Sequence, residues 1–165
     1  FKNNLRLNLN KVFKNFGLLM LYNFFIAMIL TYVFKLSDPA ENQVQIEQMV
    51  QNAMMPMFLS TVIFAPIVEE IIFRGVLYQN LRSKKWFYIP MAISILIFGG
   101  MHLIAGFEAG NGIKEFLYLF QYGGMAFFMI RAMENTDTII GSMGVHFLNN
   151  ALAFSAIVAT LMIII

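Results

Sequence analysis

Five long runs of the chain carry no charged residue. They lie at residues 16–34, 48–68, 86–107, 116–130 and 138–165. A helix needs about 20 apolar residues to cross a bilayer, where only the helix itself can satisfy its backbone hydrogen bonds. Four runs are long enough, and 116–130 spans only if Lys114, Glu115 and Arg131 lie in the interfaces. The pattern predicts an all-α, polytopic transmembrane helical bundle with about five spans.

The composition agrees with a membrane protein and narrows the chemistry. Of the 165 residues, 59% are hydrophobic and 12% are charged, so the charged outer faces that a soluble bundle needs are missing. The chain has no cysteine, which excludes disulfides, a thiolate nucleophile and a cysteine metal site. Its net charge of +2, without a basic block, indicates no nucleic-acid partner.

Basic residues are unevenly divided between alternate connections. One side carries Lys2, Arg6, Lys11, Lys14, Arg82, Lys84, Lys85 and Arg131, and the other carries Lys35 and Lys114. This bias predicts a cytoplasmic N-terminus and an external segment at 35–52. We expect one domain over 1–165, and a fragment of a longer chain, because it starts without methionine and ends in an apolar run. The Lys-, Asn-, Ile- and Phe-rich usage favours a multi-pass protein of a bacterial cell membrane.

Ionisable residues inside the apolar helices are the strongest functional signal. They are Glu69, Glu70, Arg74, His102 and His146, and the two histidines are the only ones in the chain. Charged side chains inside a span cost roughly 2.5–3.5 kcal/mol each on insertion scales. Taken singly, each histidine is as well explained by an interhelical hydrogen bond. Their concentration together predicts a site.

The spacing of the charged residues separates two carboxylates. Glu70 and Arg74 are four residues apart and share a helical face, so we expect an ion pair with a mainly structural role. Glu69 points about 100° away around the helix, which leaves it free to act as a general base.

Two further pairs repeat this one-turn spacing. Phe98 and His102 share a face of one helix, and His146 and Asn150 share a face of another. A carboxylate, two imidazoles and an amide from three helices can activate water and stabilise an oxyanion.

Three complete motifs follow one another in order on apolar helices. They are Glu69, Glu70 and Arg74; Phe98 and His102; and His146 and Asn150. The region 65–153 thereby resembles the CAAX protease and bacteriocin-processing family, also called Abi, which includes the Ras-converting CAAX endopeptidases. The resemblance implies a helical membrane peptidase whose site opens towards the cytoplasm. It also implies that Glu69 activates water with help from His102, while His146 and Asn150 hold the oxyanion.

We therefore expect an intramembrane endopeptidase that cuts a membrane-associated or lipidated peptide or protein. No cofactor is favoured, because the chain lacks a His-Glu-x-x-His pair. Zinc held by Glu69, His102 and His146 is the alternative. The rival functions are a non-catalytic immunity or regulatory membrane protein that keeps the motifs, and a proton-coupled carrier. The bacterial residue usage favours a peptide precursor, such as a bacteriocin leader, over a prenylated protein.

Overall fold

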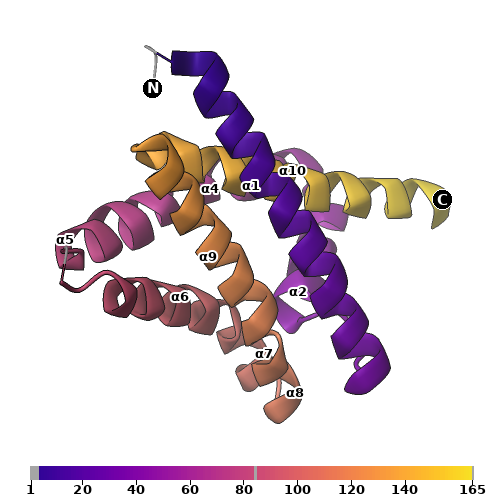
Figure 1. Cartoon of the computed structure of the whole chain (residues 1–165). Coiled ribbons are helices and arrows are strands. Elements are labelled where there is room, and N and C mark those ends of the chain that lie inside the picture. Colours follow the sequence, from indigo (N-terminus) through magenta and orange to yellow (C-terminus); the bar gives the residue numbers. More distant parts are fainter. Residues whose placement is uncertain (1–3, 84, 165) are drawn as a thin grey trace.

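The computed structural model describes residues 4–83 and 85–164, and all regular secondary structure in these ranges is helical (Figure 1). The elements are α1 (Leu5–Met28), η2 (Ile29–Val33), α2 (Glu41–Asn52), α3 (Met54–Phe58), η3 (Leu59–Phe64), α4 (Ala65–Glu70), η4 (Ile71–Tyr78), α5 (Gln79–Leu81), α6 (Tyr88–His102), α7 (Ile104–Glu108), α8 (Ile113–Leu117), α9 (Leu119–Thr136) and α10 (Ile139–Ile164), where η marks π-helical segments. The expected all-α membrane bundle is confirmed.

Three helical stretches among the described residues are long and apolar enough to cross a membrane. They are Leu5–Val33, Met54–Leu81 and Ile139–Ile163, and Tyr88–His102 is a shorter apolar helix. Only 11–22% of each long apolar window is buried by the rest of the protein, as expected for surfaces that face lipid. The total of five spans and the cytoplasmic N-terminus stay predictions.

Helix α9 occupies the centre of the bundle. It packs against α1, α6 and α10, and Figure 1 shows it between α6 and α1. Close packing depends on glycine: a Cβ at Gly124 would collide with the ring of Tyr22, whose hydroxyl donates a 2.7 Å hydrogen bond to the carbonyl of Phe120. Close approach of the two helices thus requires glycine at Gly124, whereas a Cβ at Gly100 would meet no atom within 4 Å.

The end of α9 differs from the expected boundary. Residues 131–137 were expected to form a connection, but the helix continues to Thr136 and stops at Asp137, which adopts a left-handed conformation (φ 54°). The last turns of the helix are held by an ion pair, with Arg82 Nη2 2.7 Å from Glu134 Oε2. Arg131 therefore lies within a helix.

The second apolar run is broken. Ala53 adopts a non-helical conformation (φ −150°, ψ 63°), so α2 is a separate helix and a new helical stretch runs from Met54 to Leu81. Within that stretch the π-helical segment η3 precedes Pro66, which lacks an N–H and cannot continue a regular hydrogen-bond ladder. Helix α4, which carries both glutamates, begins at this irregularity.

The third apolar run is also shorter than expected. Helix α6 ends at His102 instead of continuing to residue 107, because the chain turns at Leu103 before the short helix α7. His102 therefore stands at a helix end beside the turn, where its ring reaches the space between helices.

Candidate active site

The three motifs meet although they come from three separate helices. Glu69 lies in α4, His102 ends α6, and His146 and Asn150 lie in α10. All four side chains line one cavity of about 700 Å³. The convergence expected from the sequence is therefore observed, whereas the catalytic roles of the four residues stay predictions.

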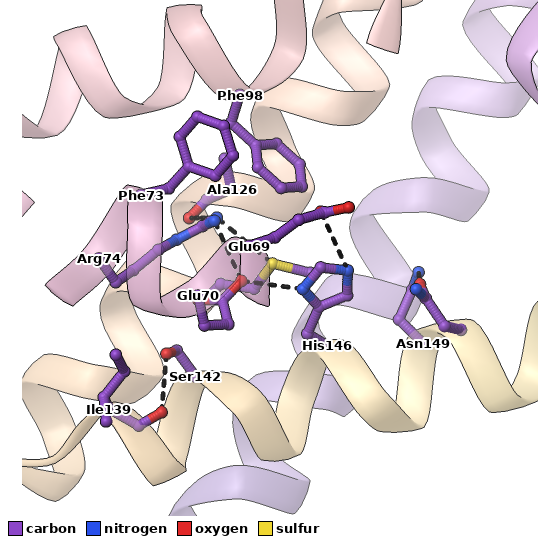
Figure 2. Close-up of polar contacts among 12 residues, drawn as sticks. Glu69, Glu70, Phe73, Arg74, Phe98, Ala126, Ile139, Ser142, His146 and Asn149 are labelled. Atoms are coloured by element: carbon purple, nitrogen blue, oxygen red, sulfur yellow. Dashed lines mark hydrogen bonds and ion pairs between the residues drawn. The ribbon is translucent and has the colours of Figure 1, made fainter. Parts of the chain in front are cut away.

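Glu70 lies at the centre of a fully buried polar network. Its side chain and that of Arg74 are both 0% exposed, with Arg74 Nη1 3.0 Å from Glu70 Oε1. The expected ion pair is thus present. Glu70 Oε1 also lies 2.8 Å from Nδ1 of His146, a contact that the sequence did not predict (Figure 2). Because a carboxylate can only accept, Nδ1 of His146 carries the proton.

Arg74 is held by helix α9 as well as by Glu70. Its Nη2 donates to the carbonyl of Ala126 and to the sulfur of Met129, both at 3.3 Å. The guanidinium lies over the ring of Phe98, 4.5 Å from the centroid, as Figure 2 shows. A cation stacked on an aromatic ring and hydrogen-bonded on its edge is suited to burial.

Phe98 joins the motifs to one another. Its ring is fully buried and lies 4.6 Å from the ring of His102, 5.9 Å from that of His146 and 5.3 Å from that of Phe73. One aromatic side chain therefore contacts the cation and both imidazoles, which is consistent with the supporting role expected for it.

Glu69 approaches His146 from the opposite side. Its side chain is 21% exposed and lines the cavity, with Oε2 3.8 Å from His146 Nε2. That separation is too long for a hydrogen bond. Oε2 makes no hydrogen bond within the described part of the chain. The two adjacent glutamates thus contact the two nitrogens of one imidazole, Glu70 tightly and Glu69 loosely (Figure 2).

His102 is fixed in one tautomer and one orientation. Its Nδ1 lies 2.8 Å from the carbonyl of Phe98, so Nδ1 donates and the Nε2 of a neutral ring is left to accept. The ring stacks on Tyr122, with centroids 4.7 Å apart and planes at 27°. Nε2 is thereby left to interact with a ligand in the cavity.

Asn150 is partly engaged by the protein. Its Nδ2 donates to the carbonyl of Thr61 at 2.9 Å, and its Oδ1 accepts from Asn149 Nδ2 at 3.1 Å. An amide nitrogen has two N–H donors, so one remains for a ligand. Asn149, the neighbour of Asn150 in the sequence, also lines the cavity.

Several residues around the site were not found from the sequence. Tyr122 and Thr61 contact the motif residues only through the tertiary fold, and no local spacing signals them. Helix α2 supplies a whole wall of the cavity through Asn42, Gln43, Ile46, Glu47 and Gln51. The available signal was the amide-rich sequence of this stretch, which was expected only to be part of the external segment at 35–52.

The position of the cavity links two sequence-based expectations that disagree. The cavity extends to Pro39 and to α2, within the connection that the charge count assigns to the outside. The family resemblance instead implied a site that opens towards the cytoplasm. In this structure the two expectations exclude each other, because a cavity that opens towards the cytoplasm requires the orientation opposite to the one that the charge bias predicts. Cysteine labelling can decide between them.

A metal role also stays open to experiment. Within the described ranges, no group of three or more His, Asp and Glu residues is arranged to hold a metal ion. The zinc alternative with Glu69, His102 and His146 would therefore require side-chain movement, and chelation is the direct test.

Comparison with known proteins bears on the family that the motifs resemble. The profile of the Rce1-like family, described as type II CAAX prenyl endopeptidase Rce1-like, matches residues 51–152, which include all three motifs. A protein of Bacillus subtilis (strain 168) named "Putative membrane peptidase YdiL" is 35% identical over 71 residues, covering 43% of this chain and 29% of that relative. No solved structure matches the chain. The family expected from the motifs is confirmed: the chain belongs to the Rce1-like family of type II CAAX prenyl endopeptidases.

Proposed function

We propose that the protein is an intramembrane endopeptidase that hydrolyses a peptide bond with water activated by Glu69. The observation that supports this most strongly is the division between adjacent carboxylates. Glu70 is neutralised by Arg74 and bonded to His146, while Glu69 lines the cavity and its Oε2, 3.8 Å from His146 Nε2, makes no hydrogen bond among the described residues. A general base must be free to take a proton, and only Glu69 meets that requirement.

The proposed reaction needs no covalent intermediate. Water binds between the Glu69 carboxylate and Nε2 of His102, and Glu69 takes a proton as the water oxygen attacks the carbonyl carbon of the substrate. The resulting oxyanion accepts hydrogen bonds from the free N–H of Asn150 and from His146 Nε2–H, which requires the imidazolium form of His146. Glu69 then returns the proton to the leaving nitrogen as the C–N bond breaks, giving an amine and a carboxylic acid, which ionises to the carboxylate.

Glu70 and Arg74 take part indirectly. Glu70 fixes the orientation of His146 by accepting from Nδ1, and its negative charge is compatible with an imidazolium. Arg74 balances Glu70, so that the pair can stay buried. We therefore assign Glu70 as a positioning residue, in addition to its structural role in the ion pair.

The proposed substrate is a peptide segment at the membrane. The cavity lies among helices that are apolar enough to span a bilayer, so a membrane-associated or lipidated peptide reaches it readily. A secreted-peptide precursor or a bacteriocin leader is favoured by the bacterial residue usage. A prenylated protein, the substrate named in the family description, is the alternative.

The test is cleavage by the purified protein in liposomes, with peptide products identified by mass spectrometry. We expect cleavage by the wild type, none by a folded His102→Ala variant, full activity after exhaustive chelation and no stoichiometric metal. Loss of activity on chelation, with about one zinc per chain, would replace the proposal with the metal mechanism. No cleavage of any peptide would favour the non-catalytic or carrier functions.

A further inference from the structure

The cavity wall opposite the motif residues is rich in amide side chains. It is formed by α2, where Gln43, Glu47 and Gln51 recur every fourth residue and therefore share a helical face. Asn42 lines the cavity beside them. A row of amide side chains matches the donors and acceptors of an extended peptide backbone. This wall is suited to bind a peptide without regard to most of its side chains.

One charge on that wall stands out from the amides. Among the described residues that line the cavity, the acidic ones are Glu47 and Glu69, and none is Lys or Arg. The two carboxylates outweigh the single imidazolium that the proposed reaction requires at His146, so the cavity is formally negative. Apolar surroundings strengthen such a field, because the lower dielectric screens it less than water does.

Glu47 is held in place within the wall. Its Oε1 accepts a 3.1 Å hydrogen bond from Gln43 Nε2, and its side chain is partly buried. Within the described part of the chain, no cation pairs with Glu47 to neutralise its charge. The proposed reaction makes no use of Glu47, so the carboxylate is available to interact with a side chain of the substrate.

We propose that Glu47 selects peptides that carry Lys or Arg in the segment held by the cavity, and that acidic segments are disfavoured. The same field disfavours a free C-terminal carboxylate in the cavity, so the preferred scissile bond is internal. A cavity of about 700 Å³ is large enough for only a few residues, which places the selected residue near the bond that is cut. This inference rests on the proposed function, since it assumes that the cavity receives the peptide.

The experiment measures binding separately from catalysis. The Glu69→Gln variant in nanodiscs is titrated with short fluorescent Ala/Leu peptides that are amidated at the C-terminus and differ in one central residue, Lys, Gln or Glu. We expect the Lys peptide to bind about 3- to 5-fold more tightly than the Gln peptide, the range of a partly exposed ion pair, and the Glu peptide to bind more weakly still. Replacing the C-terminal amide by a free acid should also weaken binding.

Charge variants then assign the preference to Glu47. Adding Glu47→Gln should abolish the difference between the Lys and Gln peptides, and Glu47→Lys should reverse the order of the Lys and Glu peptides. Glu108 is the matched control, because it is an exposed glutamate on α7, which packs against α2 and does not line the cavity. Glu108→Lys changes the net charge equally and should leave the preference intact.

The outcomes separate this inference from the proposed function. Equal binding of the three peptides, an unchanged preference in Glu47→Lys, or no binding of any peptide would overturn the role of Glu47. A Lys preference that depends on Glu47, in a protein whose wild type cuts none of these peptides, would support the role while counting against the peptidase.

Discussion

Glu69 and Glu70 are neighbours in the sequence, yet they belong to different environments. Glu70 is 0% exposed and is bonded to Arg74 and His146, whereas Glu69 is 21% exposed and faces the cavity. The rotation of about 100° per residue in a helix is enough to place one carboxylate in a rigid core and the other at a reactive surface. Two adjacent glutamates can therefore serve two different roles, one in a buried structural ion pair and the other as a general base.

The surroundings of the two faces differ in the same way. The Glu70 face is covered by α9, whose Ala126 and Met129 bind Arg74 directly. The Glu69 face looks across the cavity to α2, which carries amides and Glu47. One side is therefore adapted to stability and the other to a ligand.

The largest effect that we predict is in cysteine labelling at positions 37 and 83. Labelling should be all-or-none, because the two positions lie on opposite sides of the membrane. Because the chain has no cysteine, Ser37→Cys and Ser83→Cys are each single-cysteine variants at exposed positions. From the basic-residue bias, a membrane-impermeant maleimide should label Ser37→Cys in intact cells and Ser83→Cys only after lysis. The opposite pattern would reverse the orientation and turn the Glu69 side towards the cytoplasm, as the family resemblance implied.

The structural role of the Glu70 side is tested by removing the positive charge of Arg74. Arg74→Ala leaves Glu70 buried without its charge partner, which should lower stability by about 3–5 kcal/mol and reduce folded yield. Arg82→Ala is the matched control, because its partner Glu134 is 2.7 Å away but the Arg82 side chain is 44% exposed. Thermal unfolding in detergent measures both. A stable Arg74→Ala protein would show that the buried pair is dispensable.

The cavity side is tested by removing the side-chain amide of Asn150. Asn150→Ala removes the proposed oxyanion donor and should lower kcat by about 10²–10³-fold, with a smaller effect on substrate binding. Asn149→Ala removes only the side chain that donates to Asn150 Oδ1, so its effect on kcat should be smaller. Equal losses in the two variants, measured with a cleaved peptide, would assign the pair to positioning rather than to oxyanion binding.

The smallest predicted effect is a pH dependence of protein stability that arises at the N-terminal end of α2. Glu115 is buried in α8, outside the candidate spans, and accepts a 3.4 Å hydrogen bond from the N–H of Glu41, the first residue of α2. Burial raises the pKa of the Glu115 carboxyl above its usual 4.5, and the nearby Glu41 charge adds to the rise, although the N–H opposes it. The folded protein therefore binds this proton more readily than the unfolded chain does.

The sign of the pH effect follows from that difference. The contribution of Glu115 to stability is complete below pH 4.5 and is lost as the pH rises through the higher pKa of the folded state. Unfolding temperatures measured from pH 4 to 7 should show this loss in the wild type and in the exposed control Glu108→Gln. Glu115→Gln should lack this component, and a slope identical to that of the wild type would refute the assignment.

Local spacing explains what was predictable from the sequence. Glu70 and Arg74 are four positions apart and therefore share a face in any helix, so their ion pair was foreseen. The order of the motifs and the cost of isolated charge in lipid indicated that His102 and His146 would meet Glu69. None of these inferences needs the tertiary structure.

Long-range geometry explains what was missed. The Glu70–His146 bond and the stacking of His102 on Tyr122 depend on how α4, α6, α9 and α10 pack, which no spacing within one helix specifies. The break at Ala53 was hidden because the run 48–68 is apolar on both sides of it. As a result, the last residues of α2 were assigned to the second apolar run instead of to a separate helix.

The most direct test of the central claim makes the same change at both glutamates. Glu69→Gln and Glu70→Gln each remove one carboxylate and keep the size of the side chain, so unfolding temperature and peptide turnover can be compared on matched proteins. We predict that Glu69→Gln unfolds like the wild type but turns over about 10²–10⁴-fold more slowly, the usual worth of a general base, and that Glu70→Gln loses stability because Arg74 is left unpaired. A Glu69→Gln protein that cuts peptide at the wild-type rate would contradict the account.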